Sequence, residues 1–163
     1  MYKKKQFLKL EKKYNKYQDS GTVGSMMQIC HKKLEVNKAL KKLKNNCKVL
    51  EIGAGSSPHL KYIKHHFGKY IFLENSKFAI NFLKKKFDNN KKFQFKIYDG
   101  KKIPYKKNYF DRIIISHVLE HISDPENFLE EMMMKLKKDG ILSIALPSDP
   151  GLLWRLGRTF LKL

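Results

Sequence analysis

From residue 47 onward, short apolar segments alternate with longer amphipathic segments, and this alternation constrains the fold more than any other feature. One apolar segment contains three consecutive isoleucines, at positions 113–115. Such runs are typical of strands that are covered on both faces. The five predicted strands span residues 49–52, 70–73, 93–98, 110–116 and 141–146. Strands that alternate with helices predict an α/β fold in which right-handed crossovers build a doubly wound parallel sheet.

Helices are expected between these strands, because the intervening segments carry helix boundary signals. The predicted helices span residues 59–67, 77–87 and 125–139. Gly68 is expected to end the first helix and Gly140 the third, while Ser76 and Asp124 are expected to cap the second and the third. Pro125 suits the first position of the third helix, where its missing N–H is not needed.

Two parts of the sequence, residues 1–46 and 151–163, lie outside the alternation of strands and helices. Residues 1–46 are predicted to form an N-terminal helical segment, interrupted by a glycine-containing loop at residues 19–25. Residues 47–150 form the predicted α/β domain. Residues 151–163 are an apolar and basic tail, a composition that suits a helix lying on a membrane surface and thus a peripheral membrane contact.

The formal net charge of +20 raises the question of a nucleic-acid partner. Only three of the 35 basic residues are arginines, and the lysines are distributed along the whole chain. Guanidinium groups are the preferred donors for bidentate contacts to phosphate and guanine. We therefore expect no specific nucleic-acid partner.

The sequence favours a cytoplasmic location. No apolar run approaches the ~20 residues that a membrane span needs, and no apolar stretch follows the basic start of the chain, as a secretory signal requires. The two cysteines, Cys30 and Cys47, match no metal-ligand spacing and are expected to be free thiols.

The segment VLEIGAGSS, residues 49–57, places a glycine turn directly after the first predicted strand. Gly53 and Gly55 allow the backbone to turn tightly and to approach a ligand closely. Pro58 stands where the dinucleotide-binding pattern has its third glycine, which disfavours a nicotinamide-dependent oxidoreductase. Glu51 would repel a phosphate but can meet an ammonium group. A tight turn without any ligand remains the alternative.

Polar residues also follow the second, third and fourth predicted strands. They are Glu74, Asn75, Asp99, Gly100, Ser116 and His117. A carboxylate at Glu74 can accept hydrogen bonds from ribose hydroxyls, and Asp99 can accept one from an adenine amino group. Ligands of such sheets bind beyond the carboxyl ends of the strands, so we expect these residues to face one site. The alternatives are solvated charges at strand ends and, for Asp99, a simple Asp-Gly turn.

Together these segments resemble class I S-adenosylmethionine-dependent methyltransferases, in particular the small-molecule subgroup. The resemblance covers about residues 47–150 and rests on VLEIGAGSS, FLEN, IYDG and IPYKKNYFDRIIISHVLEHISDPENFLEEMMMKLKKDGILSIALP. It implies a mainly parallel, Rossmann-like sheet of about five strands in the order 3-2-1-4-5. It also implies S-adenosylmethionine as cofactor. No metal is expected, because His117 and His121 lack an evident third ligand.

The resemblance assigns roles to the residues that follow the strands. The expected cofactor-binding residues are Glu51, Gly53, Ala54 and Gly55 for the methionine part, Glu74 with Asn75 for the ribose, Asp99 with Gly100 for the adenine, and Ser116 with His117 from the fourth strand. A base is needed only when the acceptor loses a proton. His121 is the first candidate for that base and Asp149 the second.

The class of methyl acceptor is inferred from two sequence motifs that are absent after the fourth predicted strand. It reads SHVL, without the Asn/Asp-Pro-Pro-aromatic segment of enzymes that methylate nucleobase amino groups and without a Pro-Cys nucleophile. A small-molecule or lipid- or sugar-linked acceptor is expected. The family has two further strands, so residues 151–163 are expected to begin a missing C-terminal part. A truncated, nonenzymatic cofactor-binding remnant or interaction module is the alternative function.

Overall fold

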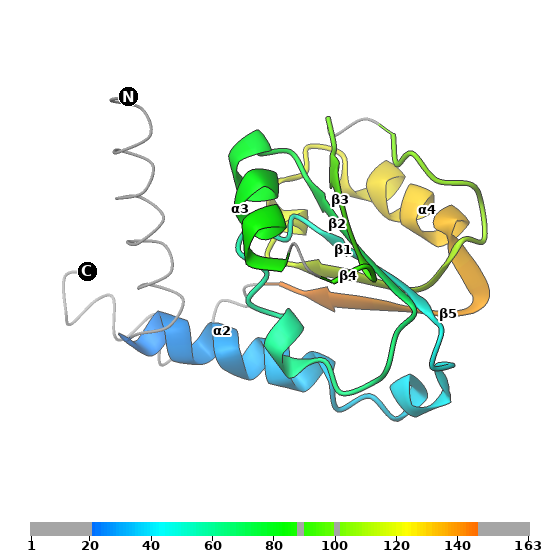
Figure 1. The fold of residues 1–163 in the computed structure, drawn as a ribbon, viewed down its shortest axis with the longest axis horizontal. Coiled ribbons are helices and arrows are strands. Elements are labelled where there is room, and N and C mark those ends of the chain that lie inside the picture. The colour runs from blue at the N-terminus through cyan, green and yellow to red at the C-terminus, as the bar shows by residue number, and fades with distance from the viewer. Residues whose placement is uncertain (1–20, 88–89, 100–101, 147–163) are drawn as a thin grey trace.

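The computed structural model describes residues 21–87, 90–99 and 102–146 (Figure 1). Five strands in these residues form one sheet, in the order β3-β2-β1-β4-β5. The strands are β1 Lys48–Ile52, β2 Lys69–Glu74, β3 Phe93–Ile97, β4 Phe110–Ser116 and β5 Leu136–Ala145. Each neighbouring pair is parallel. The predicted α/β fold, with its Rossmann-like strand order, is therefore confirmed.

Helices connect the strands and precede the first of them. They are α2 Gly21–Leu34, η1 Lys38–Lys42, η2 Leu60–Tyr62, α3 Lys77–Phe87, η3 Leu119–His121 and α4 Pro125–Lys135, where η marks a short 3₁₀ helix. The predicted caps of α3 and α4 are confirmed. The Ser76 hydroxyl accepts a hydrogen bond from the Ala79 amide at 3.3 Å, and the Asp124 carboxylate accepts one from the Asn127 amide at 3.2 Å. Pro125 is the first residue of α4.

Alternate residues of the strands point to opposite faces of the sheet, and a helix covers each face (Figure 1). On one face, Phe128 and Met132 of α4 pack on strand residues such as Leu50. On the other face, Leu83 of α3 packs on strand residues such as Phe72. One hydrophobic core thus packs α4 against one face of the sheet, and a second packs α3 against the other face. The carboxyl ends of the strands stay available for a site.

Residues 59–67 differ from the predicted helix, since only the single 3₁₀ turn η2 forms there. The chain becomes extended at Ile63, where ψ is 123°. Leu60, Ile63 and Phe67 still pack against the α3 side of the sheet. Their apolar spacing matches a helix, yet a loop lying on the core satisfies the same burial without helical hydrogen bonds.

Gly140 does not end α4, contrary to the prediction. The helix ends at Lys135, and β5 begins at the next residue. Leu136 pairs with Phe110, but the next partner of β4 in β5 is five residues further along, so residues 137–140 bulge out of register. The bulge brings Gly140 against Leu136, where an added Cβ would lie 2.6 Å from the Leu136 Cγ. The glycine thus serves a strand bulge rather than a helix end.

The predicted loop at residues 19–25 is also wrong for its described part, because α2 begins at Gly21. Glycine lowers helix stability by about 1 kcal/mol relative to alanine. The end of α2 is held by tertiary contacts instead: His31 on α2 and Glu35 just after it are both buried. The rest of the predicted N-terminal helical segment before residue 21 and the tail at 151–163 lie outside the described residues.

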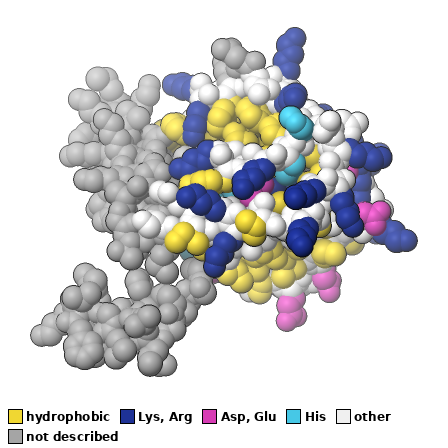
Figure 2. Space-filling view, turned by 90° about the horizontal axis from the view of Figure 1, so that it is seen from below, with side chains coloured by type: hydrophobic (Ala, Val, Ile, Leu, Met, Phe, Trp, Pro, Cys, Tyr) yellow, Lys and Arg dark blue, Asp and Glu magenta, His cyan; other side chains and the backbone are white. Residues whose placement is uncertain are grey.

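The surface of the described residues carries dispersed positive charge. Figure 2 shows Lys and Arg side chains scattered over one face, with apolar and uncharged surface between them. This distribution agrees with a composition that is basic throughout. In the part of the chain that the structure describes, no helix combines the length and the apolar character of a membrane span.

Candidate functional site

The turn after β1 places its backbone in the left-handed region. Gly53 has φ +64° and Gly55 has φ +52°, values that residues with a Cβ rarely adopt. A Cβ on Gly53 would also collide with the Val118 side chain, whereas a Cβ on Gly55 would meet nothing within 4 Å. The Gly53 amide donates to the Leu73 carbonyl at 2.8 Å, which fixes the turn against the end of β2. Gly55 therefore exposes backbone to open space.

Glu74, at the end of β2, holds this turn from the side. Its carboxylate accepts hydrogen bonds from the amides of Gly55 and Ser76, each at 3.0 Å. The side chain is buried between the two segments. A carboxylate has about four acceptor positions, so two remain for a ligand next to the glycine turn.

Glu51 is buried at the end of β1, next to the turn. One carboxylate oxygen accepts hydrogen bonds from the Ser57 hydroxyl at 2.9 Å and from the Tyr70 hydroxyl at 2.8 Å. Burial raises the pKa of Glu51, although nearby His59 and the two hydroxyl donors act in the opposite direction. A cation beside this carboxyl would favour its ionised form.

A small cavity of about 40 Å³ lies at this edge of the sheet, enclosed by the glycine turn, the end of β4 and α2. It is lined by Met27, His31, Glu51, Gly53, Ala54, Gly55, Pro58, Ser116 and His117. Six of these residues are predicted site residues from two different strand ends. Met27 and His31 come from α2, and neither was among the predicted site residues.

His117 has an unusual backbone at the edge of this cavity. Its φ is +55°, a strained conformation for a residue with a side chain, and its amide donates to the Ala145 carbonyl at 2.9 Å. Burial lowers the pKa of the imidazole, opposed by Glu120. Its buried Nε2 has no hydrogen-bond partner among the described residues. Strain and an unpaired polar atom at one position favour a binding role.

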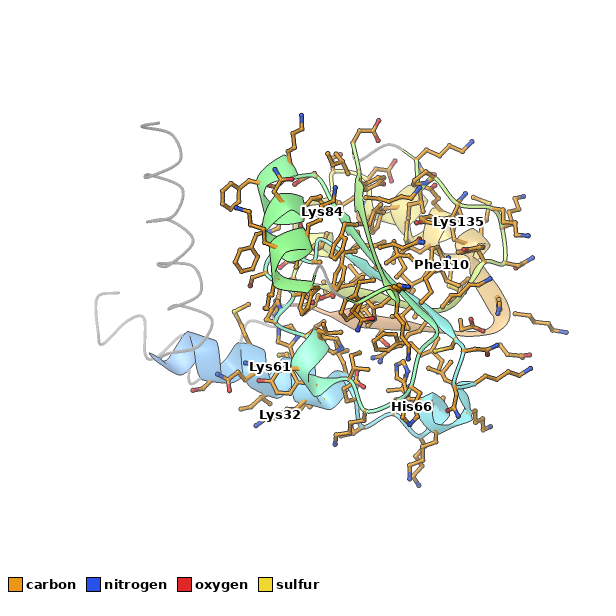
Figure 3. The ribbon with its side chains drawn as sticks, in the orientation of Figure 1. Lys32, Lys61, His66, Lys84, Phe110 and Lys135 are labelled. Atoms are coloured by element: carbon orange, nitrogen blue, oxygen red, sulfur yellow. The ribbon has the colours of Figure 1, made fainter. Side chains whose placement is uncertain are left out.

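His31 is the site residue that the sequence reasoning missed. It is only 3% exposed, and its ring lies 6.0 Å from the His117 ring, edge to face. The Tyr62 ring of η2 stacks on it at 5.9 Å. Figure 3 shows Lys32 of α2 and Lys61 of η2 on the same side of the molecule, where these two helices meet. The available signal was the four-residue spacing of His31 and Glu35, which places both on one helical face.

The other predicted site residues that the structure describes do not line the cavity; they are Glu74, Asn75, Asp99 and His121. Asn75 and Asp99 are exposed at the ends of β2 and after β3, on the same edge of the sheet. His121 is exposed on η3, with its amide bonded to the Val118 carbonyl. Gly100 and Asp149 lie outside the described residues. The roles predicted for the site residues, inside the cavity and outside it, stay predictions.

A glycine turn and acidic strand ends at the carboxyl edge of a parallel sheet define a cofactor-binding α/β domain. Residues 50–144 match the family model for the methyltransferase domain. This match covers more than half of the chain, so the chain belongs to the methyltransferase domain family. A search of curated proteins finds no match for the sequence.

Solved structures with a similar fold include several methyltransferases. A candidate S-adenosyl-L-methionine-dependent methyltransferase from Methanococcus maripaludis has 20% identity and a TM-score of 0.64, over 80% of this chain and 60% of that chain. A SAM-dependent methyltransferase from Aquifex aeolicus has 21% identity and a TM-score of 0.56, over 85% and 86%. The trans-methyltransferase CalH, in complex with SAH, has 19% identity and a TM-score of 0.59, over 86% and 41%.

The chain spans about half the length of the first solved structures that it matches, such as 46% of YcgJ from Bacillus subtilis. At these identities the likeness shows the fold.

Proposed function

We propose that this chain binds S-adenosylmethionine and transfers its methyl group to a small-molecule acceptor or to one linked to a lipid or sugar. The observation that carries the proposal is the cavity at the carboxyl ends of β1 and β4, inside a domain of the methyltransferase family. When bound, the cofactor supplies a methyl group that its sulfonium already activates. The protein then has to position the reactants and exclude water.

The geometry at the end of β1 suits the methionine part of this cofactor. Glu51 lines the cavity, where its carboxylate can receive the ammonium group. Gly53, Ala54 and Gly55 provide the wall, and the open space beside Gly55 admits a ligand close to the backbone. Ser116 and His117 close the opposite side. This arrangement supports the roles that the resemblance assigns to these residues.

The nucleoside part of the cofactor would extend along the same edge, toward β2 and β3. Glu74 is next to Gly55 and keeps acceptor capacity for ribose hydroxyls. Asn75 and Asp99 are exposed beyond it, toward the position proposed for the adenine. A carboxylate pair at these strand ends also disfavours a phosphate-containing cofactor, by repulsion between like charges.

The test is isothermal calorimetry of the chain with S-adenosylmethionine and S-adenosylhomocysteine. We expect Kd values within about 1 μM to 1 mM, the usual range of KM. Glu74→Ala is expected to weaken binding at least about tenfold, because one hydrogen-bonded carboxylate contributes about 1.5–3 kcal/mol. Glu130→Gln, on the exposed side of α4, is the control and should bind as the wild type does.

Three outcomes of this experiment separate the alternatives. A folded chain that binds neither compound contradicts the proposal. Binding of NADH in their place would indicate an oxidoreductase. Binding of the cofactor without transfer of a radiolabelled methyl group to any hydroxyl, amine or thiol acceptor in a panel would favour a nonenzymatic cofactor-binding module.

A further inference from the structure

The cavity contains a buried imidazole nitrogen that the proposed cofactor roles leave unexplained. His31 lines the cavity, and its Nε2 is buried and has no hydrogen-bond partner in the part of the chain that the structure describes. Leaving a buried polar atom unpaired costs about 1–3 kcal/mol. Such a cost in a cavity lined by a strained His117 points to a ligand that supplies the missing hydrogen bond.

A chain of buried polar side chains leads from the sheet to His31. Arg112 of β4 forms an ion pair with Glu35 at 2.6 Å, and the same carboxylate oxygen contacts Nε2 of His59 at 2.9 Å. The two remaining Nδ1 atoms, of His59 and His31, lie 3.2 Å apart. Ser116 adds a hydroxyl oxygen 3.4 Å from the His31 Nδ1. These side chains thus lead to the His31 ring, whose Nε2 is unpaired among the described residues, as is Nε2 of His117.

The order of hydrogen-bond donors and acceptors along this series of side chains fixes the tautomer of His31. Burial opposes the ionisation of Glu35, but the hydrogen bonds from His59 and Arg112 outweigh it and lower the pKa of Glu35 to about 2. The ionised carboxylate only accepts hydrogen bonds, so His59 must donate from Nε2. Arg112 already balances the charge of Glu35. A cation at His59 would place a second buried positive charge against the carboxylate oxygen that Arg112 already pairs, which is unfavourable.

In its neutral form, His59 donates from Nε2 and carries a lone pair on Nδ1. The contact between the two rings then requires His31 to donate from Nδ1, a hydrogen atom that the Ser116 oxygen can share. A neutral imidazole has one donor and one acceptor nitrogen. Nε2 of His31 is consequently the acceptor, and it presents a bare lone pair to the cavity.

We infer that His31 accepts the proton of a hydroxyl group on the methyl acceptor, with His59 and Glu35 as positioning residues that fix its tautomer. The inference rests on the proposed methyl transfer. In that step the hydroxyl oxygen forms a bond to the methyl carbon, and the carbon–sulfur bond breaks with its electron pair left on sulfur. The hydroxyl proton passes to Nε2 of His31, which becomes an imidazolium and later releases the proton to water.

The electrostatic surroundings favour this role for a hydroxyl acceptor. Burial is the largest cause that lowers the pKa of His31, to about 4. Glu51 is the acidic residue on the cavity wall, and burial raises its pKa. The imidazole is therefore unprotonated at neutral pH and a weak base. A hydroxyl oxygen becomes a strong acid as it gains a methyl group, so a weak base suffices, whereas a methylated amine would keep its proton.

The first test measures the tautomer and does not depend on turnover. Nitrogen-15 NMR of histidine-labelled chain saturated with S-adenosylhomocysteine distinguishes protonated from bare ring nitrogens. We expect His31 to show a protonated Nδ1 and a bare Nε2 at neutral pH. A protonated Nε2 would overturn the inference while leaving the proposed function intact. Failure of the wild-type chain to bind S-adenosylhomocysteine would instead contradict the proposed function.

A matched pair of variants tests the positioning role of His59. Glutamine can donate to Glu35 through its amide nitrogen and accept from His31 through its amide oxygen. His59→Gln should therefore keep the His31 tautomer, and His59→Leu should lose it, giving a mixture of the two forms. Equal spectra for the two variants, with circular dichroism showing both folded, would contradict the positioning role.

The third measurement connects the imidazole with methyl transfer. His31→Gln should lower transfer of a radiolabelled methyl group to hydroxyl acceptors by about 10²–10⁴-fold, the usual contribution of a general base. His66→Gln is the control, because His66 is an exposed histidine on the loop before β2 (Figure 3). Undiminished transfer in His31→Gln overturns the inference. If no hydroxyl acceptor reacts, the nitrogen-15 measurement of the His31 tautomer decides whether the inference holds.

Discussion

At the scale of a single residue, ionisation of Glu51 is expected to make ligand binding in the cavity depend on pH. Burial raises its pKa above the usual value for a glutamic acid, because the ionised form loses its water. An ammonium group in the cavity would favour the ionised form and drive off the proton. We predict that affinity for S-adenosylhomocysteine rises as pH increases through this raised pKa and becomes level above it.

Calorimetry at one pH in two buffers with different ionisation enthalpies measures the proton that binding releases. Glu51→Gln should bind more weakly and should release no proton, because an amide does not titrate in this range. Affinity that stays constant as pH rises above the ordinary pKa of a glutamic acid would contradict the proposed ammonium contact.

Local sequence sufficed for some site residues and not for others. Glu51, Gly53 and Glu74 each lie at the end of a strand or just beyond it, so a correct strand prediction already places them at one edge. His31 depends on contacts across 28 residues to His59 and across 85 residues to Ser116. No short-range pattern encodes such a distance, because it arises when α2 packs on the sheet.

At the scale of elements, a predicted strand or helix was confirmed where only one backbone conformation could bury its apolar side chains. The strand at 110–116 has the predicted limits, because its apolar run can be satisfied only between two covered faces. The helix predicted at 59–67 failed because three apolar side chains reach the core equally well from a loop. The spacing of apolar residues determines which side chains are buried, and only sometimes the backbone that buries them.

The glycine turn after β1 offers a matched pair of substitutions. Both Gly53→Ala and Gly55→Ala place a Cβ on a left-handed backbone, at a cost of about 1–2 kcal/mol. Gly53→Ala adds a collision with Val118, whereas a Cβ on Gly55 meets no protein atom within 4 Å. We predict that Gly53→Ala destabilises the chain more, and that Gly55→Ala chiefly reduces cofactor binding.

Urea denaturation measures the first effect and calorimetry with S-adenosylhomocysteine the second. Similar losses of stability in both variants would show that Val118 moves away freely. Unchanged cofactor affinity in Gly55→Ala would show that the open space beside this glycine is not the binding site.

On the scale of the whole molecule, one buried ion pair connects the N-terminal helix to the sheet. The side chains of Glu35, which follows α2, and Arg112 on β4 are both fully buried, and the guanidinium also donates to Ser143 of β5 at 3.1 Å. The pair brings α2 over the strand ends and thereby completes the cavity. Removing one partner of such a pair costs about 3–5 kcal/mol, because the other charge stays buried.

We predict that Glu35→Gln lowers the free energy of unfolding by about this amount, and that the loss also removes the His31 wall of the cavity. The stabilisation that the Glu35 carboxylate contributes depends on pH in a definite direction. The folded-state pKa of Glu35 is lowered to about 2 from the ordinary 4.5. The stabilisation is therefore complete above about 4.5 and is lost as pH falls toward 2.

Urea denaturation at a series of pH values checks both statements. The stability difference between wild type and Glu35→Gln should be constant at neutral pH and should shrink on acidification, because the wild-type carboxyl becomes neutral as well. Glu130→Gln, at an exposed position of α4, should stay within about 0.5 kcal/mol of the wild type. A difference that does not depend on pH would mean that packing of α2, and not the charge of Glu35, closes the cavity.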